Sequence, residues 1–210
     1  MARIKVYLII SALVLFLAAD TVKADSENSR ECQVKAAFLY NFINFVDWPK
    51  EKQVDSNEPI TVGIIGYEDF IKAFEPIKNK KIKNRSISIK YFAGYEKLKR
   101  SKDADDHQWN QKMEVLKTCH VLVFCTCNSE RIENSSQIIK ALKDSPVLTV
   151  GETKGFLESG GVINFLMEDE KVRFEINNAA AKQAKLNIRS KLLRLAKRVI
   201  EEDGAKGAKD

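Results

Sequence analysis

The sequence has few of the residues and motifs on which most catalytic and cofactor sites depend. It contains two histidines, and it lacks the phosphate-binding patterns G-x-x-x-x-G-K-[ST] and G-x-G-x-x-G and the nucleophile-elbow pattern G-x-S-x-G. These absences leave no recognisable site for nucleotide phosphates and no nucleophile motif beside His107 or His120. We therefore predict that the protein is not an enzyme and that it holds neither a cofactor nor a metal ion.

A large excess of one sign of charge is also missing. Lys and Arg together number 35 against 29 Asp and Glu, which leaves a net charge of +6 over 210 residues. Binding to nucleic-acid phosphates requires a dense basic stripe, which this sequence lacks, so we predict no nucleic-acid partner. Only four prolines are present, and neither a proline-rich linker nor an internal repeat occurs. One domain is the economical interpretation.

The first residues have the features of a secretory signal peptide. Arg3 and Lys5 supply a positive start, an apolar run follows over residues 6–19, and Val22-Lys23-Ala24 offers a small-residue cleavage site. The run is shorter than the ~20 apolar residues that a membrane span requires. We expect export from the cytoplasm and the following division of the chain: signal peptide over residues 1–24, flexible start over 25–30, folded domain over 31–202 and disordered tail over 203–210.

Four cysteines in an exported chain suggest disulfide bonds. Cys125 and Cys127 would point to the same face of a strand, a poor geometry for a bond between them. We favour a bond from Cys119 to Cys125 or Cys127, with Cys32 pairing with the sulfur that remains. A weaker alternative is an exported metal or redox protein that uses Cys119, His120, Cys125 and Cys127. The C-x-C spacing does not match the C-x₂₋₄-C spacing of closed zinc sites.

Hydrophobic periodicity predicts an α/β fold. An amphipathic helix is expected over residues 29–46, ended by Trp48-Pro49 because the residue before proline resists the helical conformation. Strands and helices then alternate, which is typical of a parallel sheet with helices on both sides. The expected strands cover residues 60–66, 86–92, 121–124 and 146–150, and the expected helices cover residues 67–77, 109–116 and 130–143.

The pattern changes toward the C-terminus. A β-hairpin is predicted from residues 162–167 and 172–176 around the acidic turn at residues 168–170, followed by a short helix over residues 178–185. From Ile188 onward Leu192, Leu195 and Val199 recur at steps of four, three and four, which predicts a closing helix. The predicted fold class is a single-domain α/β sandwich, in which helices flank a largely parallel or mixed sheet and a C-terminal hairpin and closing helix follow.

Two groups of residues are candidates for binding. Arg173, Glu175 and Asn177 face one side of a strand, where they could line a small-molecule pocket together with Trp48; equally, Arg173 and Glu175 could pair on an exposed sheet face. A partner surface is expected at the edge of the opening helix and on the basic flank of the closing helix. Its candidate residues are Tyr40, Arg189, Arg194 and Lys197.

Several segments together resemble the YfiR-like family of periplasmic proteins. They are QVKAAFLYNFINFVDWP at residues 33–49, CHVLV at 119–123, TVGE at 149–152, GGVINF at 160–165, VRFEIN at 172–177, and the stretch from Asn178 to Leu195 with its LLRLA core. The resemblance spans about residues 31–198, nearly the whole expected mature chain, and the segments occur in the family's order.

The resemblance implies a regulatory role and an α/β fold. Characterised relatives are periplasmic repressors that bind the periplasmic sensor domain of an inner-membrane diguanylate cyclase and so restrain cyclic-di-GMP synthesis and biofilm formation. Many other members are encoded beside sensor kinases. The resemblance further implies homodimers, redox-responsive disulfides and, for some members, small-molecule ligands. A small-molecule sensor that acts on a sensor kinase is therefore the alternative function.

Overall fold

A mixed sheet of seven strands forms the centre of the molecule, so the predicted α/β fold class is confirmed. The structure, a computed structural model, describes residues 29–52, 58–77, 80–98, 106–126 and 135–201. The expected signal peptide, the expected tail and Cys127 lie outside the described residues. Within the described part of the chain, none of the helices is both long and apolar enough to cross a membrane.

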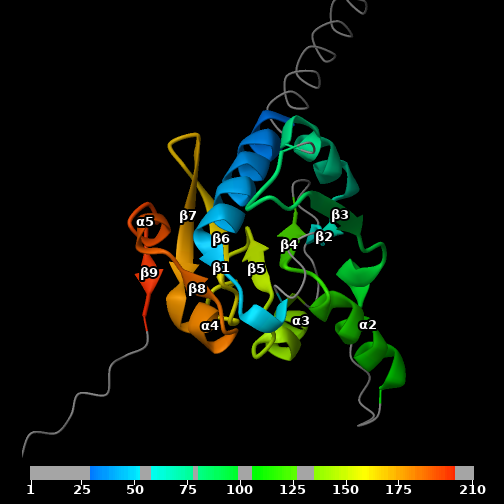
Figure 1. The fold of residues 1–210 in the computed structure, drawn as a ribbon. Helices are drawn as coiled ribbons and strands as arrows, with labels where there is room; N and C mark the ends of the chain where they lie inside the picture. The colour runs from blue at the N-terminus through cyan, green and yellow to red at the C-terminus, as the bar shows by residue number, and fades with distance from the viewer. Residues whose placement is uncertain (1–28, 53–57, 78–79, 99–105, 127–134, 202–210) are drawn as a thin grey trace, which may run out of the picture.

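The order of strands across the sheet is β3-β2-β4-β5-β6-β7-β9. β2, β3, β4, β5 and β6 run parallel, β7 is antiparallel to β6, and β9 is parallel to β7 (Figure 1). A separate two-stranded ribbon pairs β1 with β8. The strands are β1 (Val46–Asp47), β2 (Ile60–Gly66), β3 (Ile87–Tyr91), β4 (Val121–Cys125), β5 (Leu148–Gly151), β6 (Ile163–Glu168), β7 (Lys171–Asn177), β8 (Asn187–Ile188) and β9 (Val199–Ile200).

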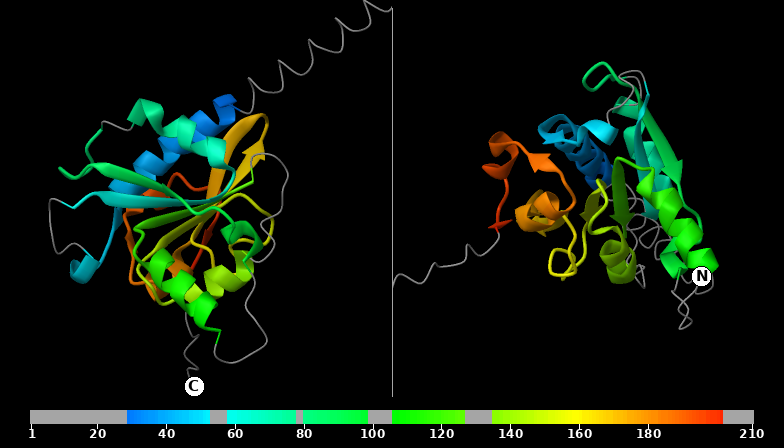
Figure 2. Two further views of the ribbon diagram at one scale, coloured as in Figure 1. Left: turned by 90° about the vertical axis from the view of Figure 1, so that its right-hand side faces the viewer. Right: turned by 60° about the horizontal axis from the view of Figure 1, so that its bottom comes forward.

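Helices cover both faces of the sheet (Figure 2). The first helix, residues 29–45, lies on one face together with η2 (Glu68–Ile77), and α2 (His107–Lys117) and α3 (Ser135–Leu142) lie on the other. The remaining short helices are η1 (Lys50–Lys52), η3 (Tyr95–Lys97), α4 (Asn178–Gln183) and α5 (Ser190–Leu193).

The two faces carry two separate hydrophobic clusters. On the face of the first helix, Phe42 stacks on Phe165 with ring centroids 5.5 Å apart and meets Phe174 edge-on at 5.0 Å. On the opposite face, Trp109 and Met113 of α2 pack with Ile138 and other residues of α3. Because β4 lies between both clusters, all five of its residues are buried, as expected of a central parallel strand. The cluster under the first helix is called the first cluster, and the cluster under α2 and α3 is called the second cluster.

The predicted closing helix over residues 188–199 is wrong. Helix α5 ends at Leu193, and the chain then extends along β7, where the backbone N–H of Lys197 donates to the carbonyl of Phe174 and that of Ile176 donates to the carbonyl of Arg198. Without this segment β7 would be an edge strand with unpaired backbone groups, so strand pairing competes successfully with the helical pattern. Leu195, expected on the buried stripe, is 64% exposed.

Two glycines allow Phe156 to pack against the sheet. A Cβ atom at Gly151 would lie 2.3 Å from a ring carbon of Phe156, and one at Gly161 would lie 2.2 Å from another. We expect Gly151→Ala to lower the free energy of unfolding by about 1–3 kcal/mol, the usual cost of overpacking. Urea denaturation measures this change.

A double-mutant cycle tests the physical cause. In a Phe156→Leu background the cost of Gly151→Ala should fall, because the ring that causes the clash has gone. Gly155→Ala is the matched control: Gly155 has a positive φ of 84° and nothing near its Cβ position, so its cost should be the same in both backgrounds. An equal cost of Gly151→Ala with and without Phe156 would contradict the packing argument.

Candidate functional site

The parallel strands β2, β4 and β5 end at one edge of the sheet. Ligands of open α/β sheets bind outside the carboxyl ends of the strands. A cavity of about 240 Å³ lies at this edge. It is lined by Glu31 and Lys35 of the first helix, Thr126 after β4, Glu152 after β5, and Phe165, Leu166 and Met167 of β6.

A buried ion pair forms the polar end of this cavity. Lys35 Nζ donates to Glu152 Oε2, and the side chains of Lys35 and Glu152 are 6% and 9% exposed. Glu152 Oε1 accepts from the backbone N–H of Thr126 and, at 2.9 Å, from its Oγ1. Lys35 also pairs with Glu31 one turn earlier on the helix. These bonds offset the cost of removing both charges from water and fix the first helix to the ends of β4 and β5.

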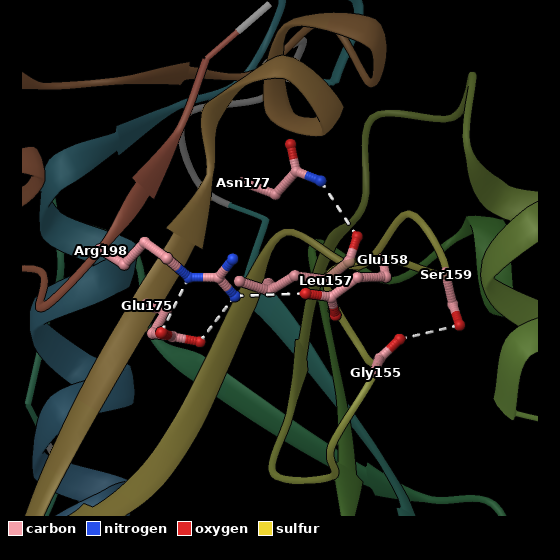
Figure 3. A network of polar contacts seen from close by, with 7 residues as sticks. All are labelled: Gly155, Leu157, Glu158, Ser159, Glu175, Asn177 and Arg198. Carbon is pink, nitrogen blue, oxygen red and sulfur yellow. Dashed lines mark hydrogen bonds and ion pairs between the residues drawn. The ribbon is translucent and has the colours of Figure 1, made fainter.

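A second polar network lies on the β7–β9 side of the sheet (Figure 3). Arg198 Nε donates to Glu175 Oε1 at 2.9 Å, and Arg198 Nη2 donates to Glu175 Oε2 at 3.1 Å and to Glu158 Oε1 at 3.3 Å. A hydrogen bond from its own backbone, and then the Arg198 side chain, lower the pKa of Glu158. The network ties the segment before β6 to β7 and to the segment leading into β9.

Asn177 links the same network to α4. Its Nδ2 donates to the carbonyl of Leu157 at 3.0 Å, and its Oδ1 accepts from the backbone N–H of Ala180 at 2.9 Å, which caps the helix. The sequence predicted that Arg173, Glu175 and Asn177 share one face of a strand. The structure brings two of them, Glu175 and Asn177, into one network. Arg173 is exposed, and the cation bound to Glu175 is Arg198, which lies in the segment expected to be helical.

Trp48 lies apart from Glu175 and Asn177. It belongs to the first cluster with Phe174 and Ile176, whereas Glu175 and Asn177 alternate with those residues along β7 and point to the other face of the sheet. Its indole Nε1–H donates to the carbonyl of His120 at 3.2 Å. Trp48 is 8% exposed, so it is a core residue and does not line a pocket together with Glu175 and Asn177.

His120 occupies a buried polar position at the amino end of β4. Its Nδ1 accepts from the backbone N–H of Thr61 at 3.1 Å, and its Nε2 lies 3.1 Å from Nη2 of Arg85. Burial, followed by the charges of Arg85 and Lys52, lowers the pKa of His120 to about 4. Burial likewise lowers the pKa of Lys52 to about 8, and its Nζ donates to the carbonyls of Lys117 and Cys119.

The described cysteines are distributed over both faces of the sheet. Cys119 has a free thiol in the second cluster, while Cys32 and Cys125 lie in the first cluster on the other side of the sheet. The favoured bond from Cys119 to Cys125 is therefore not formed, because the sheet separates the two side chains; Cys127 is outside the described residues. No group of three or more His, Cys, Asp or Glu among the described residues could hold a metal ion.

The four residues expected on a partner surface are at or near the surface, and three of them have partners within the protein. Arg189 Nε and Nη2 bind both carboxylate oxygens of Asp47 at 2.9 and 2.8 Å, and Lys197 binds Glu168 at 2.7 Å. The Tyr40 ring lies 5.5 Å from Lys80 Nζ. Arg194 is exposed beside Leu195.

Comparison with known proteins identifies the family. The sequence profile of DUF4154, described as YfiR/HmsC-like, matches residues 32–197. The chain belongs to the YfiR/HmsC-like family. The resemblance noted from the sequence over residues 31–198 is thus confirmed, with almost the same boundaries. The matched residues include Lys35, Glu152 and Glu175, and Glu31 and Arg198 lie one position outside the two ends of the match.

No curated protein matches the chain. Solved structures with a similar arrangement include an ABC domain from Streptococcus pneumoniae in complex with L-Trp, with 13% identity and a TM-score of 0.46 over 67% of this chain and 55% of that one. A conserved domain protein from Vibrio cholerae has 12% identity and a TM-score of 0.45 over 67% of this chain and 54% of that one. The chain thus spans about half the length of these structures.

Proposed function

We propose that this protein is an exported regulatory protein that acts in the periplasm. In this proposal it binds and restrains the periplasmic sensor domain of an inner-membrane signalling protein, a diguanylate cyclase, and so tunes cyclic-di-GMP output. The observation that carries the proposal is membership of the YfiR/HmsC-like family over residues 32–197. The protein acts as a homodimer and converts no substrate.

An exposed apolar residue with basic neighbours supports a docking role. Leu195 has the largest exposed fraction, 64%, among the large hydrophobic residues that the structure describes. It lies in the turn between α5 and β9, beside Arg194 and close in sequence to Lys197. A hydrophobic centre with a charged rim is typical of protein interfaces. We therefore propose that the partner contact lies on this C-terminal turn.

Capture from membranes tests the proposed function. Tagged protein is incubated with solubilised inner membranes under reducing and under oxidising conditions, and bound proteins are identified by mass spectrometry. We expect one inner-membrane protein with a periplasmic sensor domain and a cyclase output, and cyclic-di-GMP should rise in cells that lack the regulator. Capture of no such protein under either condition, with unchanged cyclic-di-GMP, would argue against the proposal.

Leu195→Glu is expected to weaken partner capture at least tenfold while leaving the melting temperature within a few degrees. A buried carboxylate at the centre of an interface is costly, whereas an exposed side chain contributes little to folding. Val115→Glu is the matched control, because Val115 is 43% exposed but lies on α2, which covers the other face of the sheet. Equal capture by both variants would place the contact elsewhere.

The second candidate function is a small-molecule sensor that acts on a sensor kinase. One observation favours it: Asn164 Oδ1 is buried with no hydrogen-bond partner among the described residues. Asn164 pairs with Glu175 across the β6–β7 ladder, beside the Arg198 network. A thermal-shift screen with nucleotides, amino acids and cofactors tests this function, since a ligand of the native state raises the melting temperature. Substitution of Asn164 by Ala should then reduce any shift.

A further inference from the structure

The ionised groups of the Lys35–Glu152 cavity do not balance. Among the described residues that line the cavity, one ammonium, that of Lys35, lies between the carboxylates of Glu31 and Glu152, so these residues carry a net charge of −1. The Lys35 ammonium is already bound to both carboxylates, which leaves it a poor binding site for an added anion. A second ammonium would restore neutrality and would find carboxylate oxygens on two sides.

The side of the lining that β6 supplies is apolar. Phe165 and Met167 lie on the same side of β6, because alternate residues of a strand share a face. Phe165 is buried against the first helix, whereas Met167 is 50% exposed at the cavity, an unusual exposure for so large an apolar side chain. Methionine adapts its shape to irregular ligands. The cavity thus has an anionic end at the strand termini and an adaptable apolar wall.

We propose that this cavity binds a small organic monoammonium ion with an apolar body. Glu31 and Glu152 hold the ammonium beside Lys35, and Phe165 and Met167 contact the apolar part. This site is independent of the docking surface at Leu195, so it goes beyond the proposed regulatory function. It is also separate from the Arg198 network, which belongs to β7, β9 and the segment before β6.

Calorimetric titration with matched probes tests the proposal on the purified full-length protein. The probes are 2-phenylethylammonium and 3-phenylpropanoate, which share an aromatic body but carry opposite charges. We expect the ammonium ion to bind at least tenfold more tightly than the carboxylate. No heat from the ammonium ion at millimolar concentration, or equal binding of both probes, would overturn the proposal.

Two substitutions locate the site. Glu31→Gln should weaken binding of 2-phenylethylammonium about tenfold, the effect of losing one charged hydrogen bond. Glu114→Gln is the matched control: Glu114 also pairs with a lysine on its own helix, at 2.6 Å, but lies on α2. Met167→Lys places a cation at the cavity wall and should abolish binding. Unchanged binding in both Glu31→Gln and Met167→Lys would overturn the assignment. Because no partner protein takes part, failure here would leave the proposed regulatory function intact.

Discussion

Replacement of Lys35 by methionine should lower the free energy of unfolding by about 3–5 kcal/mol, the usual effect of breaking a buried ion pair. Methionine keeps most of the stem of the side chain but removes the ammonium, so the Glu152 carboxylate stays buried with Thr126 as its remaining donor among the residues that the structure describes. Urea denaturation with linear extrapolation measures the change. Lys117→Met is the control, because Lys117 pairs with Glu114 at the surface, where such pairs contribute about 0–1 kcal/mol.

The double variant Lys35→Met with Glu152→Gln separates charge from packing. Glutamine keeps an acceptor for Thr126 but carries no charge, so the double variant should recover more than half of the stability that Lys35→Met loses. If the double variant were no more stable than the single one, an uncompensated charge would not be the cause. A loss below about 1 kcal/mol in Lys35→Met would also contradict the burial argument.

The stability of the protein should fall between pH 6.5 and pH 4 because of His120. Burial is the main reason that the pKa of His120 falls from 6.5 to about 4 in the folded protein, and the charges of Arg85 and Lys52 lower it further. Between pH 4 and pH 6.5 the unfolded chain therefore binds a proton that the folded protein does not. Stability then rises with pH through this window and is lost as the pH falls. The difference corresponds to about 3 kcal/mol, at about 1.4 kcal/mol for each unit of pKa.

The variant His120→Asn tests this titration. Asparagine offers an oxygen acceptor for the Thr61 N–H but cannot be protonated, so the pH dependence between 4 and 6.5 should largely disappear. His107→Asn is the control, since His107 is exposed at the start of α2 and is the other histidine of the chain. Urea denaturation at several pH values measures both variants. Equal slopes in the wild type and in His120→Asn would refute the role of His120.

A separate acid-sensitive contact joins Asp47 of β1 to Arg189, the residue after β8. Hydrogen bonding from Arg189 is the largest contribution that lowers the pKa of Asp47, to about 2, and Lys83 adds to it. This carboxylate loses its contribution to stability only below its unfolded-state pKa of 3.8. The window of Asp47 therefore lies below that of His120, so the two can be distinguished in one pH series.

The periodicity of the sequence was a sufficient guide to strands β2 to β7 of the central sheet, though not to β9. The run at residues 60–66 coincides with β2, and the acidic turn at residues 168–170 lies where β6 turns into β7. Both patterns are local: a buried parallel strand requires a continuous apolar run, and a hairpin requires a turn between alternating strands. The opening helix was predictable for the same reason, since its phenylalanines follow the helical repeat onto one face.

The candidate site was predictable only in part. The sequence singled out Glu175 and Asn177 from their alternation on one strand, but it gave no indication of Arg198, which reaches Glu175 only because the C-terminal segment pairs with β7. Lys35 and Glu152 were missed altogether. They are 117 positions apart, and an isolated lysine on a helix and an isolated glutamate after a strand are usually solvated residues.

The sequence alone determined the family, the α/β class and the course of the chain from β2 to β7, because local hydrophobic repeats and the order of motifs carry that information. The tertiary structure alone decided that residues after Leu193 add a strand, that Trp48 belongs to the core, and that Cys119 and Cys125 lie on opposite faces of the sheet. It also brought Lys35 to Glu152. Each of these outcomes depends on which strand edges and charged groups meet across the fold. Such long-range pairings produce no periodic pattern in the sequence.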